Sequence, residues 1–159
     1  MPSLYWGSKM KKKYDLEKIL PHSHPMILID EIVEVNFEKK YLTALVKISE
    51  DKIFYDKTIG GISPMLGIEF MAQAIGCYAH LKRESRKPKI GFLLGARLYD
   101  NAIKYFENKK KYTIKVTEIF TDDKIVSFDC LIYNDENSEC ACATVNVYQP
   151  DDDEKLLIG

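Results

Sequence analysis

One segment of this 159-residue chain combines two histidines with two prolines, in the order Pro21-His22-Ser23-His24-Pro25. Because proline fixes its own φ angle, the segment is stiff and holds its histidines in a limited set of positions. An imidazole exchanges protons near neutral pH, so either histidine could act as a general base. The alternative is that both are loop histidines without a catalytic role.

A second candidate is a stripe of polar residues on an otherwise apolar segment. Residues 65–81 are apolar on nearly every side of a helix, and the exceptions Glu69, Gln73 and His80 fall on one narrow stripe. A carboxylate in such surroundings is costly unless it is paired, protonated or used in catalysis. Glu69 could therefore be a general acid, or it could satisfy a backbone amide or an arginine such as Arg97. His80 lies about 16 Å beyond Glu69 by helix rise, too far to share a substrate atom.

The helix that carries Glu69 has clear end signals. Ser63 can cap it, Pro64 suits its first position, and Pro88 forbids its continuation. A helix that is apolar all round is buried all round, and this one is too short to span a bilayer. We therefore expect other parts of the chain to wrap it.

The wrapping is expected to come from about six strands in an α+β fold. A short helix over 14–20, stopped by Pro21, precedes them. Alternating or β-branched apolar residues predict strands at Met26–Val35, Leu42–Ile48, Ile90–Leu98, Tyr112–Phe120, Lys124–Tyr133 and Ser138–Tyr148. The first two form a hairpin through a polar turn. We expect one folded domain over residues 14–149, with a flexible basic arm at 1–13 and an acidic tail at 150–159.

Composition excludes several classes of protein. The chain has 23 basic and 24 acidic residues, which argues against a nucleic-acid partner. No apolar run is long enough for a transmembrane helix, and the N-terminal sequence does not match a secretory signal. The four cysteines lack zinc-ligand spacing, so we expect no metal and small reduced side chains in a cytoplasmic protein. Strand alternation predicts that Cys140 and Cys142 share one face.

Three motifs in order resemble the hotdog-fold 3-hydroxyacyl-acyl-carrier-protein dehydratases. Residues 20–30 resemble their Leu-Pro-His-x-x-Pro-x-Leu-Leu-Val-Asp opening, and the stretch from Pro64 through 69–74 resembles the start of their central helix. Residues 91–97 match the strand that follows, in a form like the ApeP-like branch associated with aryl-polyene synthesis. The resemblance runs from about residue 15 to 148. It implies a single hotdog domain, in which a curved antiparallel sheet wraps a long central helix.

The sequence departs from the common dehydratases at one position. They carry a Gly-His-Phe-Pro histidine fourteen residues before the helix glutamate, and Tyr55 stands there in this chain. A tyrosine, with an ordinary pKa of about 10, is a poor base at neutral pH. Either the base has moved to the Pro-His segment, as the ApeP-like branch suggests, or dehydratase activity is lost.

The resemblance implies the dehydration of a 3-hydroxyacyl thioester to a trans-2-enoyl thioester, in fatty-acid or polyene-type lipid synthesis. His22, at the family's Pro-His position, would remove the α-proton, and Glu69 would protonate the departing hydroxyl. A backbone N–H near Met65 would stabilise the thioester oxygen. The resemblance implies no cofactor.

The implied partners are an acyl carrier protein and a second copy of the chain, in a homodimer or a higher even oligomer. Basic residues gather after the central helix and could bind an acidic carrier: Lys82, Arg83, Arg86, Lys87 and Lys89. A solvated helix end explains them equally well. Two other functions remain open, a hotdog thioesterase in which Glu69 activates water, and a non-catalytic acyl-binding subunit that partners another enzyme.

Overall fold

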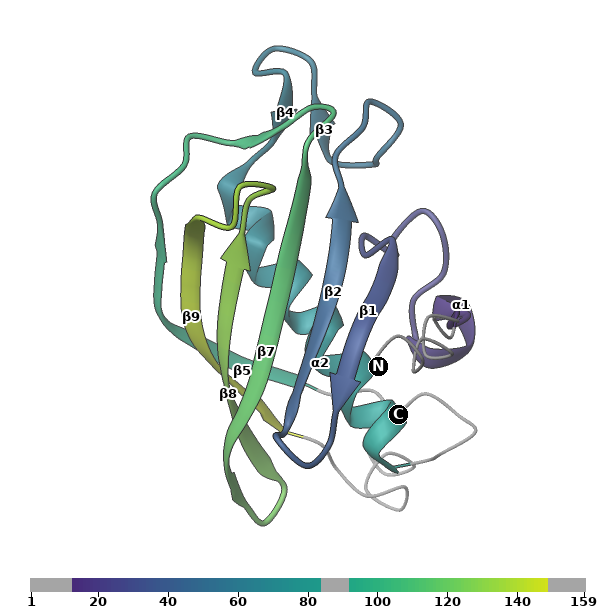
Figure 1. Ribbon diagram of the computed structural model, residues 1–159, viewed down its shortest axis with the longest axis vertical. Coiled ribbons are helices and arrows are strands. Elements are labelled where there is room, and N and C mark those ends of the chain that lie inside the picture. Colours follow the sequence, from purple (N-terminus) through teal and green to yellow (C-terminus); the bar gives the residue numbers. More distant parts are fainter. Residues whose placement is uncertain (1–12, 84–91, 149–159) are drawn as a thin grey trace, which may run out of the picture.

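A six-stranded antiparallel sheet curves around one long helix in the computed structural model, which describes residues 13–83 and 92–148 (Figure 1). In spatial order the strands are β1 (Glu31–Asn36), β2 (Tyr41–Lys47), β7 (Lys111–Asp122), β8 (Ile125–Tyr133), β9 (Glu139–Tyr148) and β5 (Phe92–Asn101). All five pairings are antiparallel. The predicted strand set is therefore confirmed in outline. The sheet has β1 at one edge and β5 at the other.

The central helix begins and ends close to where the sequence predicts. The 3-10 helix η2 (Pro64–Leu66) leads directly into α2 (Gly67–Arg83). Ser63 caps it, because its side-chain oxygen accepts a hydrogen bond from the Met65 N–H at 3.2 Å. The short helix α1 (Leu16–Ile19) is also present, and it ends before Pro21.

The core lies between α2 and the concave face of the sheet. Alternate residues of β2 point into it, and Leu42, Ala44 and Val46 are fully buried. They lie beside Ile114 and Val116 of β7, which are also fully buried. The predicted hairpin of β1 and β2 is thus confirmed, together with its inward-facing residues.

Two local features differ from the prediction. Residues 26–30 do not form a strand, because β1 begins only at Glu31. The backbone groups of Met26 and Leu28 bind a side chain of α2 in place of a neighbouring strand. A small second sheet was not foreseen, and its two-residue strands are too short to leave a pattern: β3 (Tyr55–Asp56), β4 (Gly61–Ile62) and β6 (Phe106–Glu107).

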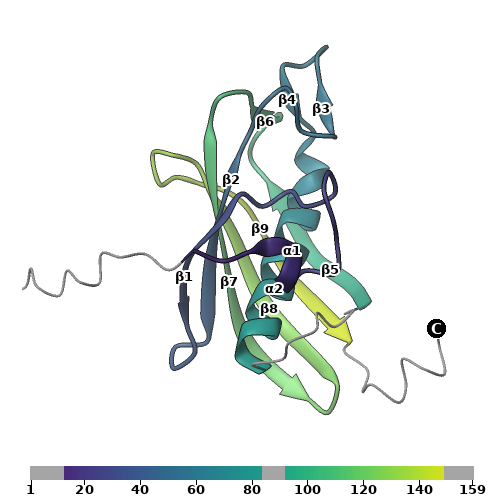
Figure 2. The same cartoon turned by 90° about the vertical axis from the view of Figure 1, so that its right-hand side faces the viewer.

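The prediction that α2 is buried on every side is wrong for the single chain. The sheet covers one side of the helix, and α1 lies against part of another (Figure 2). A strip of partly exposed residues remains between them: Ile68, Glu69, Ala72, Gly76 and Ala79. One curved sheet cannot surround a helix, so a strip this apolar stays open unless another chain covers it.

All four cysteines carry free thiols. Burial raises the pKa of Cys77 to about 12, so this thiol stays protonated at neutral pH. Cys140 is buried whereas Cys142 is partly exposed, so the prediction that they share a face is wrong. Ile132 pairs with Ala141 and Tyr133 pairs with Glu139, which leaves Cys140 as the extra residue of a β-bulge.

The predicted arm and tail fall almost wholly outside the described residues. Within the described ranges, no helix is both long and apolar enough to cross a membrane.

Candidate active site

His22 and Glu69 come together at the first turn of α2. The His22 Nε2 atom lies 3.6 Å from Glu69 Oε2, in the same chain. The two side chains are 32% and 37% exposed, so a substrate could reach both of them. Of the residues that the sequence nominates, these two form a pair with the composition needed for acid–base chemistry.

Local structure explains why His22 arrives at this position. Pro21 ends α1, whose residue Ile19 is buried, as is the following Leu20. Leu20 lies next to α2, because a Cβ added to Gly76 would come within 3.1 Å of its Cδ2 atom. The chain then turns along the helix toward its N-terminal end, where Glu69 lies. The apolar contact of Leu20 with α2 thus places His22 beside the helix.

Gln73 connects Glu69 to the segment that follows the histidines. Its amide nitrogen donates to Glu69 Oε2 at 3.1 Å and to the Met26 carbonyl at 2.8 Å. Its amide oxygen accepts from the Leu28 N–H at 2.9 Å. The side chain is only 1% exposed. Three hydrogen bonds in a buried position fix the amide orientation, so Gln73 holds the carboxylate and the histidine segment together.

Lys52 also bonds to this segment. Its ammonium donates to the Leu28 carbonyl at 2.9 Å and to Asp30 Oδ2 at 2.7 Å. Asp30 Oδ2 also accepts from the Lys47 N–H at 2.6 Å. The Asp30 N–H donates to the Leu45 carbonyl of β2 at 2.8 Å, and the Leu28 carbonyl is satisfied by Lys52, so side-chain and backbone bonds together hold the segment in place.

The two histidines of the Pro-His segment occupy different surroundings. His24 is exposed and lines a cavity of about 270 Å³ with residues such as Leu16, Asp30 and Lys52, away from Glu69. The Nδ1 atom of His22 is buried without a hydrogen-bond partner among the described residues. His22, and not His24, is therefore the histidine that the fold places next to the carboxylate.

The remaining nominated residues have other surroundings. The Met65 N–H already donates to Ser63, so it would have to exchange that partner for a substrate oxygen. Tyr55 lies in β3, and burial together with Glu50 raises its pKa, which makes it an even weaker base. His80 is buried further along α2, and its pKa is lowered by burial and by Arg83.

A larger cavity, of about 330 Å³, lies at the other end of α2. Its walls are mostly apolar and include Ile75, Ala79 and Phe128. At its rim Glu118 accepts hydrogen bonds from Lys82 at 2.8 Å and Tyr78 at 3.3 Å. Burial alone would raise the pKa of Glu118, but its hydrogen bonds outweigh that effect and the pKa is lowered. Neither His22 nor Glu69 lines this cavity.

Comparison with protein families identifies the scaffold. The family model of the ApeP-like dehydratases, described as ApeP dehydratase, matches residues 14–158. The chain belongs to the ApeP-like dehydratase family. The match covers the Pro-His segment, α2 and the whole sheet, so the family resemblance that the three motifs suggest is confirmed.

Solved structures support the same assignment. A chain of the dehydratase heterocomplex ApeI:P from Xenorhabdus doucetiae is 25% identical to this ApeP-like chain, with a TM-score of 0.82, over 92% of this chain and 98% of that one. A hypothetical thioesterase from Streptococcus pneumoniae TIGR4 has a TM-score of 0.58 at 17% identity, over 75% of this chain and 86% of its own, and supports the fold alone. The predicted hotdog fold is confirmed.

Curated relatives match over a shorter region. The 3-hydroxyacyl-[acyl-carrier-protein] dehydratase FabZ of Oceanobacillus iheyensis is 36% identical over 83 residues. FabZ of Bacillus thuringiensis is 30% identical over 83 residues. Each match spans 50% of this ApeP-like chain and less than three-fifths of the relative, at 58% and 56% of their lengths.

The sequence marks Gln73 as part of the polar stripe but does not predict its role. The available signal was its spacing, since residues four apart on a helix lie side by side and Gln73 follows Glu69 on the same stripe. Its bonds to Met26 and Leu28 span more than forty residues of sequence, and no local pattern reveals them. Lys52 was missed entirely for the same reason.

Replacing Gln73 by glutamate tests whether its amide holds this ApeP-like site together. An ionised carboxylate cannot donate to Met26 O or Glu69, and a protonated one has a single O–H, so the introduced group must keep its proton to make either bond. Its pKa is then raised in the folded state, and the variant should lose stability relative to wild type as the pH rises above about 4.3, the ordinary glutamate value. Chemical unfolding at several pH values measures this loss. If the difference in the free energy of unfolding between variant and wild type stays the same across that pH range, the assigned hydrogen bonds are wrong.

Proposed function

We propose that this chain catalyses the dehydration of a 3-hydroxyacyl thioester to a trans-2-enoyl thioester. The observation that carries the proposal is the pairing of His22 with Glu69 at 3.6 Å in a chain of the ApeP-like dehydratase family. The FabZ relatives, whose name gives the same reaction on a carrier-linked substrate, add support from sequence. General acid and base groups typically contribute about 10²–10⁴-fold each to such a rate.

The proposed step transfers two protons. His22 Nε2 takes the proton from Cα, and the electrons of that C–H bond form the Cα=Cβ double bond as the Cβ–O bond breaks. Glu69 gives its proton to the departing oxygen, which leaves as water. His22 is then protonated and Glu69 ionised, with their atoms 3.6 Å apart, so a transfer of one proton between them restores the starting state.

The closeness of the two groups also suggests a stereochemical course. Atoms only 3.6 Å apart cannot reach opposite faces of the Cα–Cβ bond of one substrate molecule. Removal of the proton and loss of the hydroxyl would therefore occur on the same face, a syn elimination. As the α-proton leaves, negative charge develops on the thioester oxygen, and we propose that the Met65 N–H at the helix start stabilises it.

We further propose that a second copy of the chain covers the open strip on α2. The strip is largely apolar around Glu69, and β5 is an edge strand of the sheet, with no further strand paired to it among the described residues. A closed dimer would cover both features. The molecular mass of the purified chain in solution tests the proposal. A monomer that assembles only with a different subunit would overturn it, and would resemble the two-component complex from Xenorhabdus.

Two finer features of this function stay predictions. The acyl carrier protein is the expected donor of the substrate, but three of the five basic residues nominated for its docking lie outside the described residues, and Lys82 bonds to Glu118. A cytoplasmic location is supported by the four free thiols.

The three candidate functions give different products from the same purified chain. With 3-hydroxyacyl thioesters, linked to a carrier or to a small thiol, we expect an enoyl thioester and no free thiol. Thiol released from plain acyl thioesters would instead indicate a thioesterase. Binding of both substrates without conversion of either would indicate an acyl-binding subunit. Absorbance of the enoyl thioester and a colour reagent for thiols separate the two enzymes in one assay, and calorimetric titration with both thioesters detects binding without conversion.

A further inference from the structure

One phenol of the edge strand β5 reaches the start of the central helix. The Tyr99 hydroxyl donates a hydrogen bond to the carbonyl of Pro64, the first residue of η2. The same carbonyl accepts the Gly67 N–H, so it joins the first helical turn to the sheet edge. Burial raises the pKa of Tyr99 to about 12, so the phenol keeps its proton, and with it the bond, at neutral pH.

Gly67 leaves the space that this contact requires. A Cβ atom at residue 67 would lie 2.4 Å from the Tyr99 hydroxyl oxygen and 3.3 Å from both Ile132 and Phe106. No real Cβ atom tolerates the first of these distances. The tyrosine and the glycine, 32 positions apart in sequence, therefore fit each other at the beginning of the helix.

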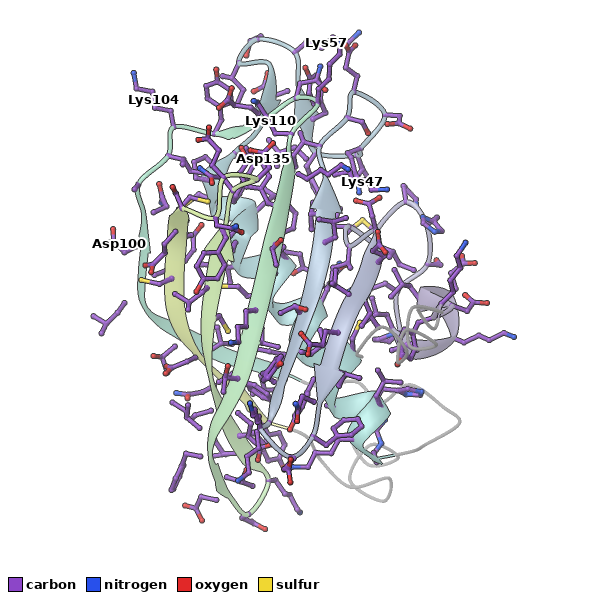
Figure 3. All side chains as sticks on the ribbon, viewed as in Figure 1. Lys47, Lys57, Asp100, Lys104, Lys110 and Asp135 are labelled. Carbon is purple, nitrogen blue, oxygen red and sulfur yellow. The ribbon has the colours of Figure 1, made fainter. Side chains whose placement is uncertain are left out.

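A bulge in β5 directs the tyrosine inward. β5 pairs with β9 through Arg97 and again from Asp100, which leaves Leu98 and Tyr99 as the two residues between these pairs. Leu98 has a φ of 56° and is 87% exposed, whereas Tyr99 packs against the buried core. Asp100 lies at the outer margin of the strand (Figure 3). A positive φ is energetically costly for a non-glycine residue. Here this conformation of Leu98 directs the side chain of Tyr99 toward the start of α2.

We infer that Tyr99 is a positioning residue for Glu69. Glu69 follows Pro64 by five residues within a continuous helical start, so a shift of the Pro64 carbonyl shifts the carboxylate. The bond thereby links the edge of the sheet to the acid of the site. The inference rests on the proposed role of Glu69 in dehydration.

Replacing Tyr99 by phenylalanine removes the bond and keeps the ring. We expect kcat to fall by roughly ten- to a hundredfold with KM within about twofold, because a misplacement of about 1 Å can cost about a hundredfold in rate. Amide hydrogen exchange over residues 65–69 should become about tenfold faster. Tyr112→Phe is the matched control, since its partly buried hydroxyl binds the Glu107 N–H, outside α2, and should leave kcat and this exchange unchanged.

A double-variant cycle with Gly67→Ala provides an independent test. The added methyl collides with the tyrosine hydroxyl, so Gly67→Ala should lower kcat by itself. Once the hydroxyl is removed by Tyr99→Phe, the most severe collision of the methyl is relieved, and the combined variant should be no less active than Gly67→Ala alone. If the losses of kcat in the two single variants simply multiply in the combined variant, the two residues act independently, and the inferred fit between them is wrong.

The two readouts separate this inference from the proposed function. If wild type does not dehydrate 3-hydroxyacyl thioesters, the proposed function fails, and exchange over residues 65–69 still tests the link between Tyr99 and the helix. Unchanged exchange in Tyr99→Phe overturns the inference. Faster exchange with unchanged kcat also overturns it, because the bond would then hold the helix without positioning the acid.

Discussion

Glutamine in place of Glu69 is expected to lower kcat for dehydration at least about a hundredfold. The amide keeps the size of the side chain but has no acidic proton to give to the departing hydroxyl, and a positioned general acid contributes about 10²–10⁴-fold. Hydration of the enoyl thioester should fall by the same factor, because the two directions share one transition state. Both rates can be followed through the absorbance of the enoyl thioester.

Folding should be nearly unaffected by this change. The side chain is 37% exposed, and a glutamine can still accept the hydrogen bond from Gln73. Thermal unfolding should therefore match wild type. Glu34→Gln is a suitable control, since Glu34 is an exposed residue of β1 that bonds to Tyr41, and its loss should leave turnover unchanged. Near-normal turnover by Glu69→Gln would end the proposed role of the carboxyl.

The second large effect is expected at His22. His22→Ala should abolish measurable turnover, whereas His24→Ala should lower it only a few-fold, because His22 lies beside Glu69 and His24 lines a cavity that does not include Glu69. Initial rates at saturating substrate distinguish the two variants. If His24→Ala were inactive and His22→Ala active, His24 would be the base. If both variants were active, neither histidine of the Pro-His segment would be the base.

His22→Gln separates a base from a hydrogen-bond donor. The glutamine amide can direct an N–H toward Glu69 and so orient it, but it cannot take up a proton from the substrate, as an unprotonated imidazole Nε2 can. We expect this variant to be as inactive as His22→Ala, with unchanged thermal unfolding. An active His22→Gln would show that residue 22 only orients the carboxyl, and another base would have to be sought.

The sequence by itself determined the main elements and the two central residues. Ser63 and Pro64 mark a helix start and the alternation of Leu42, Ala44 and Val46 marks a half-buried strand, because caps and side-chain periods are local properties. Glu69 stood out because a carboxylate on an apolar helix is costly without a partner. The preference for His22 over His24 came from the family resemblance, in which His22 occupies the position of the Pro-His histidine.

Only the tertiary structure decided which of these residues meet. That His22 and not His24 lies beside Glu69 depends on the packing of Leu20 against α2 and on the bonds of Gln73 to Met26 and Leu28. The bulge that buries Cys140 and the bulge that turns Tyr99 inward could not be predicted from the sequence either. One extra residue in a strand leaves no mark in the composition, yet it reverses which face of the sheet the following side chains occupy. Such contacts join residues far apart in sequence, and their geometry is fixed only when the sheet has closed around the helix.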